Sequence, residues 1–153
     1  MLHADIQYAP EKIKDLIKPI EEDKADMVIG SRIAGNPLKG GMPLWKFLGN
    51  RFLTKVENVF LNLNLSEYHS GFRAYNVNVL KEIRFEDLNN EYSFDTDIIV
   101  KFREKNFKIT EIPIPTHYGK ESSQIGFLKS LKYGINIFKI MIRYKYRKSQ
   151  PLE

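Results

Sequence analysis

Three side chains that can bind a metal ion stand at alternate positions near the start of the chain: His3, Asp5 and Gln7. An extended backbone turns alternate residues to the same side, so this spacing can direct all three toward one ion. A carboxylate and an amide oxygen are hard ligands, which Mg and Mn prefer. The same spacing also fits a polar loop at the end of a strand, and the residues alone leave both interpretations open.

Composition narrows the classes of protein and of partner. The sequence has 153 residues, enough for one ordinary hydrophobic core, and it has no cysteine, which excludes disulfides and thiolate metal sites. Its 24 basic and 19 acidic side chains give a net charge of +5, with the excess mostly in the last quarter. That asymmetry favours an anionic partner there, such as phosphate, a lipid headgroup or nucleic acid. No apolar stretch reaches the roughly 20 residues that a membrane-spanning helix needs.

Hydrophobic periodicity predicts the elements that must position these groups. In order they are a strand end over 1–8, a helix starting near Pro10, a buried strand over 26–30, a loop rich in Gly and Pro over 33–43, a helix over 44–63, a compact stretch over 66–75, a short helix over 77–83, a helix over 93–105, a strand over 107–115 and a helix over 125–148. The opening order of strand, helix and strand indicates a crossover unit with parallel strands.

Six blocks of sequence resemble family 2 glycosyltransferases of the GT-A type, in particular the dolichyl-phosphate mannose synthase group. Residues 3–10, HADIQYAP, are similar to the Asp-x-Asp-type motif of that family. The other blocks follow in the family's order: ADMVIGSR at 25–32, GGMPLWKFLGNR at 40–51, HSGFRAY at 69–75, FDT at 94–96 and YGKESS at 118–123. The resemblance implies an α/β fold, the later part of a GT-A domain, with a mixed sheet flanked by helices and a long amphipathic C-terminal helix.

The resemblance also implies a role for the first block. Asp5 would hold a Mg or Mn ion that neutralises the leaving nucleoside diphosphate, with Gln7 as a neighbouring ligand. His3 stands where many relatives have Asp, so it either binds the ion or orients the loop.

Further positions carried over from the family are expected to bind the donor or the acceptor. Arg32 and Arg51 match arginines that line phosphates, for which a planar guanidinium is suited; a surface salt bridge is the alternative for each. Ser70 and Arg73 are expected to bind a sugar hydroxyl or a phosphate.

The family leaves the general base open. Some relatives have Asp where Gly71 stands, and this chain must use another group if that carboxylate is the base. The candidates are Asp95, Asp97 and Glu67, of which Asp95 matches the family block best. A helix N-terminal cap is the alternative role for Asp95. An acceptor phosphate is already ionised near neutral pH and needs no base.

A second loop is implied to close over the donor diphosphate. In it Lys120, Ser122 and Ser123 are expected to donate hydrogen bonds to phosphate. His117 is either a further metal ligand or a lone histidine in a solvated loop.

The C-terminal helix has an apolar stripe, Phe127, Leu131, Ile135, Phe138 and Ile142, and a basic face. The stripe is expected to be core, and the basic face is expected to lie on an anionic membrane surface. Nucleic acid is not expected, because no reading motif accompanies the basic residues.

Two domains are expected: residues 1–124 as part of a GT-A catalytic domain and 125–153 as an amphipathic basic helix and tail. The implied function is inverting transfer of a sugar from a nucleoside-diphosphate donor to a polyprenyl phosphate or a glycan. The alternative is a non-catalytic basic module that binds anionic membrane or nucleic acid. Relatives have a nucleotide-binding half before the Asp5 block, so we expect an incomplete enzyme that self-associates. The expected location is the cytoplasm or the cytoplasmic face of a membrane.

Overall fold

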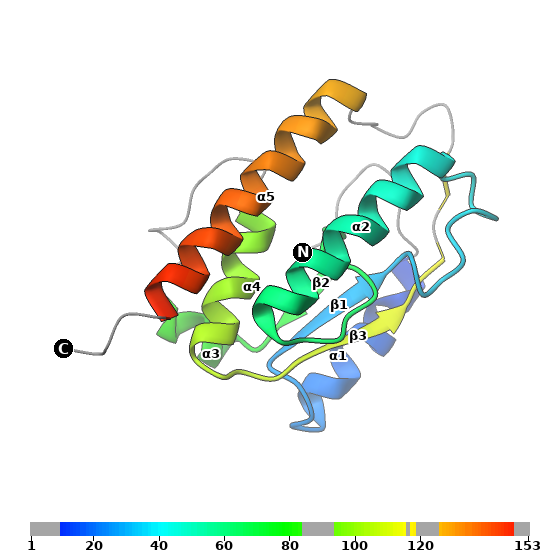
Figure 1. Cartoon of the computed structure of the whole chain (residues 1–153). Helices are drawn as coiled ribbons and strands as arrows, with labels where there is room; N and C mark the ends of the chain where they lie inside the picture. Colours follow the sequence, from blue (N-terminus) through cyan, green and yellow to red (C-terminus); the bar gives the residue numbers. More distant parts are fainter. Residues whose placement is uncertain (1–9, 84–93, 116, 119–125, 149–153) are drawn as a thin grey trace.

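The computed structural model describes residues 10–83, 94–115, 117–118 and 126–148. The elements are a short 3-10 helix Pro10–Lys12, α1 Ile13–Glu21, β1 Met27–Ser31, α2 Leu44–Leu61, β2 Arg73–Tyr75, α3 Val77–Glu82, α4 Phe94–Glu104, β3 Ile109–Pro113 and α5 Phe127–Lys148. The predicted helices and the strands over 26–30 and 107–115 are confirmed, with ends that differ by a few residues. The α/β fold class is therefore confirmed (Figure 1).

The three strands form a mixed sheet in the order β2-β1-β3. β1 pairs in parallel with β3 and antiparallel with β2, so that Val28 lies between Ala74 and Thr110. The periodicity did not predict β2, because three residues are too few to establish alternation. The predicted strand over 1–8 lies outside the described residues.

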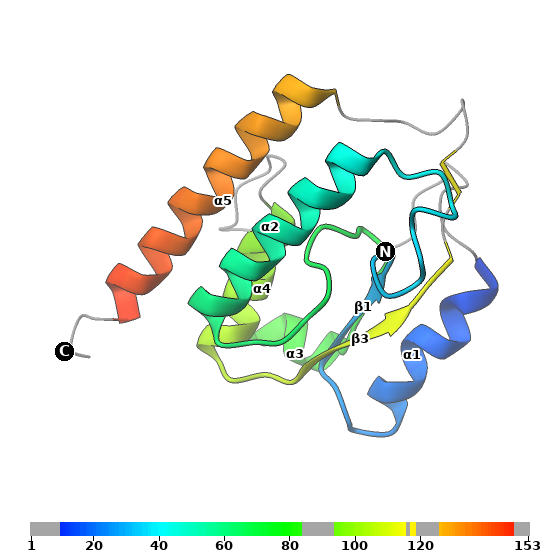
Figure 2. The same cartoon turned by 45° about the vertical axis from the view of Figure 1, so that its right-hand side comes forward.

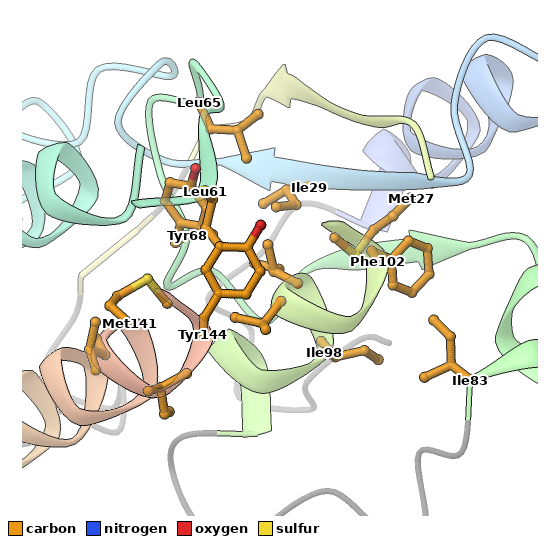
Figure 3. Close-up of a cluster of buried hydrophobic side chains, with 14 of the residues drawn as sticks. Met27, Ile29, Leu61, Leu65, Tyr68, Ile83, Ile98, Phe102, Met141 and Tyr144 are labelled. Atoms are coloured by element: carbon orange, nitrogen blue, oxygen red, sulfur yellow. The ribbon is translucent and has the colours of Figure 1, made fainter. Parts of the chain in front are cut away.

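The sheet separates two hydrophobic clusters. Met27 and Ile29 of β1 belong to the larger cluster, which α4, α5 and the end of α2 complete, and Figure 3 shows its packing. Val28 points the other way and packs with Leu16 of α1. Both views place α1 across the sheet from α2, α4 and α5 (Figures 1 and 2). The alternation explains why β1 is buried at all five positions.

The polarity of α2 is the reverse of an ordinary surface helix. Its buried side is mostly polar, with Asn50, Thr54 and Glu57 followed by Leu61. Five of its large apolar side chains are exposed instead, while Leu53 and Phe60 are partly buried against the core. The exposed ones are Leu44, Trp45, Leu48, Phe52 and Val59. An apolar face left in contact with water indicates a surface that binds another group.

The expected core stripe of α5 was wrong. The core residues are Ile137, Ile140, Met141 and Tyr144, which recur at helical spacing. The residues Leu131, Ile135 and Ile142 of the predicted stripe are exposed. Both faces of α5 carry apolar residues, so periodicity alone could not select the buried one. α5 packs beside α2 (Figure 2). Both of these neighbouring helices carry exposed apolar side chains.

The loop after β1 is held closely against the end of β3. A Cβ at Gly35 would lie 1.8 Å from the carbonyl oxygen of Ile114, so only glycine fits there. The amide of Tyr118 donates to the carbonyl of Gly40 at 2.8 Å. These contacts fix the loop that follows Arg32.

Candidate functional site

A buried ion pair joins the end of β1 to the loop between α2 and β2. Arg32 donates from Nε to Oε1 of Glu67 at 2.8 Å, and its Nη2 contacts the same oxygen. The backbone amide of Arg32 donates to Oε2 at 2.7 Å, and Nδ2 of Asn50 donates to Oε1 at 2.8 Å. Arg32 is 9% exposed and Glu67 is fully buried. Glu67 thus orients both the side chain and the backbone of Arg32.

The carboxyl of Glu67 is ionised despite its burial. Burial acts to raise its pKa, but the charge of Arg32 and the hydrogen bonds from Arg32 and Asn50 outweigh burial, and the pKa is lowered. A carboxylate with all these donors is an anchor for Arg32. Its geometry does not fit the base role considered for Glu67 from the sequence.

The outer edge of Arg32 faces two further groups. Nη1 donates to the hydroxyl of Tyr118 at 3.0 Å, and Nη2 donates to the carbonyl of His69 at 3.1 Å. The ammonium of Lys46 lies over the Tyr118 ring, 5.6 Å from its centroid. Burial and then the nearby charge of Arg32 lower the pKa of Lys46. Two cations that repel each other in a partly buried place favour an anion between or beside them.

Arg32 and Lys46 line a cavity of about 410 Å³ between α2 and α5, which we call the α2–α5 groove. Its lining is Arg32, Met42, Trp45, Lys46, Gly49, Asn50, Phe52, Leu53, His69, Ser130, Leu131, Tyr133, Gly134, Ile135 and Phe138. Several of its apolar side chains are exposed, including Trp45 at 42% and Phe52 at 59%. The groove therefore offers apolar contact area together with two cations, which suits an amphiphilic anion.

A cluster of polar side chains adjoins the groove, and two of its members, His69 and Tyr133, line it. The other two are Glu57 and Thr96, and we call the four the buried polar cluster. Nε2 of His69 lies 3.2 Å from Oε2 of Glu57, and Nδ1 of His69 lies 3.0 Å from the hydroxyl of Tyr133. Thr96 donates to Oε1 of Glu57 at 3.2 Å. Burial lowers the pKa of His69 to about 3 and raises that of Glu57 well above its usual value. His69 is therefore neutral near pH 7, and burial favours the protonated, neutral form of Glu57.

Arg73 and Ser70 lie away from the groove lining. The Arg73 guanidinium is fully buried and donates to the carbonyls of Tyr68, Ser70 and Asp95 at 2.6 to 2.8 Å. The hydroxyl of Ser70 accepts from the amide of Phe72 at 3.3 Å. These contacts tie the loop before β2 to the start of α4. The expected binding of sugar or phosphate by Ser70 and Arg73 stays a prediction.

The two candidate bases begin α4. The carboxylate of Asp95 lies 3.4 Å from Nη1 of Arg73. Asp97 is partly exposed, and burial raises its pKa against the charges of Arg143 and Arg147. Neither carboxylate lines the groove, and their catalytic role stays a prediction.

Of the other predicted site residues, most lie in parts of the chain that the structure does not describe, and two are exposed. His3, Asp5, Gln7, Lys120, Ser122 and Ser123 lie outside the described residues. Arg51 is exposed on α2 and does not line the groove, and His117 is exposed. Within the described ranges, no group of three or more His, Cys, Asp or Glu side chains is arranged to hold a metal ion.

The sequence analysis assigned no role to four polar residues that line the groove. Lys46, Asn50 and His69 stand inside the quoted family blocks, so the signal was present but no role was assigned to them. Tyr133 had no signal, because a tyrosine on an amphipathic helix reads as ordinary packing. Its contact with His69 joins residues 64 positions apart, which only the fold brings together.

The fold and the site define an α/β domain that presents a buried arginine beside an apolar groove between two helices. Residues 1–84, more than half of the chain, match the family described as "Glycosyl transferase family 2". The chain belongs to glycosyl transferase family 2. Membership favours an enzyme over the non-catalytic basic module considered from the sequence.

Three relatives of the chain carry names that describe their chemistry. The chain is 33% identical over 115 residues to the low-salt glycan biosynthesis hexosyltransferase Agl6 of Haloferax volcanii, covering 74% of this chain and 27% of that protein. It is 29% identical over 145 residues to the UDP-N-acetylglucosamine–dolichyl-phosphate N-acetylglucosaminyltransferase of Methanococcus voltae, covering 95% and 57%. A third, the glycosyltransferase AglD of Haloferax volcanii, is 23% identical over 115 residues, covering 72% and 18%. The chain thus spans less than two thirds of each of these relatives.

Proposed function

We propose that this protein takes part in transferring a sugar from a nucleoside-diphosphate donor to a lipid phosphate of the polyprenyl type. The observation that carries the proposal is the α2–α5 groove, in which apolar side chains and the cations Arg32 and Lys46 line one cavity. The dolichyl-phosphate acceptor in the name of the Methanococcus voltae relative agrees with this choice.

The apolar lining favours a lipid over a glycan acceptor. Trp45, Phe52 and Leu131 are large, exposed and on the walls of the groove. An isoprenoid chain would cover them, and each buried CH₂ contributes about 0.8 kcal/mol. A glycan would bring hydroxyl groups to walls that offer them few partners.

The cations favour a phosphate at the head of that lipid. Glu67 fixes the guanidinium of Arg32 before any ligand arrives, so little ordering entropy is lost on binding. A phosphate beside Arg32 and Lys46 would also relieve the repulsion between them. Its oxygens would meet the edge of Arg32 that now faces the Tyr118 hydroxyl.

A phosphate acceptor also simplifies the chemistry. Its oxygen is ionised near neutral pH and attacks the sugar without prior loss of a proton, so transfer depends on positioning and on charge stabilisation. Asp95 and Asp97 would be needed as bases only for a hydroxyl acceptor. This fits their place outside the groove lining.

The donor diphosphate is proposed to bind with a divalent ion. We propose Asp5 and Gln7 as its ligands, with His3 beside them, because their block resembles the Asp-x-Asp-type motif and their oxygen atoms suit Mg or Mn. When bound, the ion would supply positive charge to the leaving diphosphate. Lys120, Ser122 and Ser123 are proposed to contact the same diphosphate.

The exposed apolar faces of α2 and α5 are proposed to rest on an anionic membrane surface, where a lipid phosphate is found. Leu48 and Ile142 are 57% and 60% exposed, and Lys139 and Arg143, which neighbour Ile142 in the sequence of α5, are exposed as well. Such a surface combines burial of apolar groups with attraction to anionic headgroups. None of the described helices is long and apolar enough to cross a membrane.

The test is a transfer assay with the purified full-length protein. Radiolabelled sugar nucleotides are offered with polyprenyl phosphate, with the corresponding polyprenol and with a soluble glycan. We expect label in the organic phase only with polyprenyl phosphate, as a product that mild acid hydrolyses. Label transferred to the glycan instead would contradict the proposed acceptor.

A further inference from the structure

The buried polar cluster joins four separate parts of the chain. Glu57 comes from α2, His69 from the loop before β2, Thr96 from α4 and Tyr133 from α5. Glu57 and Thr96 are fully buried, and the His69 side chain is 8% exposed. A polar cluster in such a place is unusual, because burying polar groups costs free energy unless they find partners.

Hydrogen bonds fix positions that apolar packing leaves adjustable. α5 also packs on its neighbours through apolar side chains, among them Ile137, Met141 and Phe138, whose contacts are not directional. The hydroxyl of Tyr133 lies 3.0 Å from Nδ1 of His69, and the two rings meet edge to face with centroids 5.5 Å apart. This contact links the first half of α5 to the loop before β2.

The same two residues also form the groove. His69 and Tyr133 both line it, and the carbonyl of His69 accepts from Nη2 of Arg32 at 3.1 Å. His69 therefore contacts Arg32 through its backbone and α5 through its ring.

We propose that His69 and Tyr133 are positioning residues that hold α5 against the loop before β2 and thereby keep the α2–α5 groove in the shape that binds a lipid phosphate. The proposal rests on the proposed function of the groove. It predicts that loss of the Tyr133 hydroxyl changes acceptor binding, while donor binding and turnover of bound substrates change little.

The first test compares Tyr133→Phe with Tyr144→Phe in the full-length protein. Both changes remove one hydroxyl from α5, but Tyr144 lies in the hydrophobic cluster, outside the buried polar cluster. We expect Tyr133→Phe to raise the KM for farnesyl phosphate about five- to tenfold, the factor that one neutral hydrogen bond gives. The KM for the donor and kcat should stay within about twofold, and Tyr144→Phe should leave all three within that range.

A second pair of variants separates positioning from a loss of folding. In His69→Asn the amide stands where Nδ1 stood and can keep the contact with Tyr133, whereas in His69→Gln it stands nearer the position of Nε2. We expect His69→Asn to bind farnesyl phosphate within about threefold of the unaltered protein and His69→Gln to bind several-fold more weakly. If both variants bind farnesyl phosphate equally weakly, the contact between Nδ1 of His69 and Tyr133 does not position the groove, and the proposal is overturned.

Hydrogen exchange tests the positioning without any ligand. Amides of α5 should exchange faster in Tyr133→Phe than in Tyr144→Phe, while amides of α1 should not differ. Unchanged exchange in α5 would overturn the inference even if the groove binds lipid phosphate. Absence of farnesyl phosphate binding in the unaltered protein, with faster α5 exchange in Tyr133→Phe, would instead reject the proposed acceptor and leave the positioning of α5 standing.

Discussion

Glu67 holds the guanidinium of Arg32 from inside the protein, with Oε1 2.8 Å from Nε and with no solvent access to the carboxylate. Arg32 also lines the α2–α5 groove, where its Nη1 donates to the hydroxyl of Tyr118. A cation fixed in this way offers its charge to a ligand without having to be ordered first. Replacing either partner would leave a buried charge without compensation.

We therefore expect Glu67→Gln to lower the free energy of unfolding by about 3–5 kcal/mol, the range for breaking a buried ion pair from one side. The matched control is Glu104→Gln, which removes a carboxylate paired with Lys101 and Arg147 at the surface. That change should cost less than about 1 kcal/mol. Urea unfolding measures both, and equal effects would show that Glu67 does not anchor Arg32.

The pKa values of Glu57 and His69 shift in opposite directions on folding, which predicts opposite pH dependences of stability. The pKa of His69 falls from 6.5 to about 3, so the unfolded chain binds a proton first and stability is lost as pH falls below 6.5. The pKa of Glu57 is raised from 4.5, so the unfolded chain releases its proton first and stability is lost as pH rises above 4.5. Between these values the two effects oppose each other.

Above pH 6.5 His69 is neutral in both the folded and the unfolded chain, so of these two groups only Glu57 still makes stability depend on pH. Stability should then fall with rising pH, by at most about 1.4 kcal/mol per pH unit, and Glu57→Gln should remove this part of the slope. Urea unfolding at a series of pH values from 6.5 upward measures the difference in slope. Parallel curves for the two proteins would mean that Glu57 is ionised in the fold.

Asp5→Asn should abolish Mn-dependent binding of the donor nucleotide, because an amide supplies no negative charge to the ion. Asp15→Asn is the control, since Asp15 is exposed and pairs only locally with Lys12. Calorimetric titration of the nucleoside diphosphate, with and without Mn, gives the comparison. Unchanged Mn dependence in Asp5→Asn would remove Asp5 as a ligand.

Membrane association is expected to depend on the exposed apolar face of α2. Purified protein should sediment with anionic phospholipid vesicles more than with neutral ones, and the difference should shrink as salt rises. Leu48→Ser should weaken sedimentation, whereas Val77→Ser, an equally exposed position on α3, should not. Equal and negligible binding to both kinds of vesicle would exclude the membrane surface.

The helices were predicted well from the sequence, because each helical hydrophobic pattern repeats over enough residues to be recognised, as in α2 and α4. The face of α5 that was predicted to be buried was the wrong one. Ile135 and Ile137 each belong to an apolar stripe of this helix, and only packing in the folded protein buries the stripe of Ile137. Also missed was β2, whose three residues pair with β1 across more than 40 positions.

The candidate site was predicted in part. Arg32 came from its family block, and the structure adds the reason for its position, the carboxylate of Glu67. Sequence proximity gave no hint of this pair, because 35 residues separate its members. The groove was not predictable either, since it needs α2 and α5 side by side, and no periodicity reports that arrangement.

Binding of farnesyl phosphate, farnesol and inorganic phosphate to the full-length protein and to Arg32→Lys tests the acceptor site most directly. Trp45 lines the groove and is the only tryptophan of the 153-residue sequence, so a change in tryptophan fluorescence during titration reports occupancy of the groove. The Trp45→Phe protein serves as the control that gives the background signal. We expect the unaltered protein to bind farnesyl phosphate at least tenfold more tightly than farnesol or phosphate, and Arg32→Lys to remove most of that preference, roughly the loss of one charge-assisted contact. Equal affinity for farnesyl phosphate and farnesol in the unaltered protein, or an unchanged preference in Arg32→Lys, would contradict a lipid-phosphate site at Arg32.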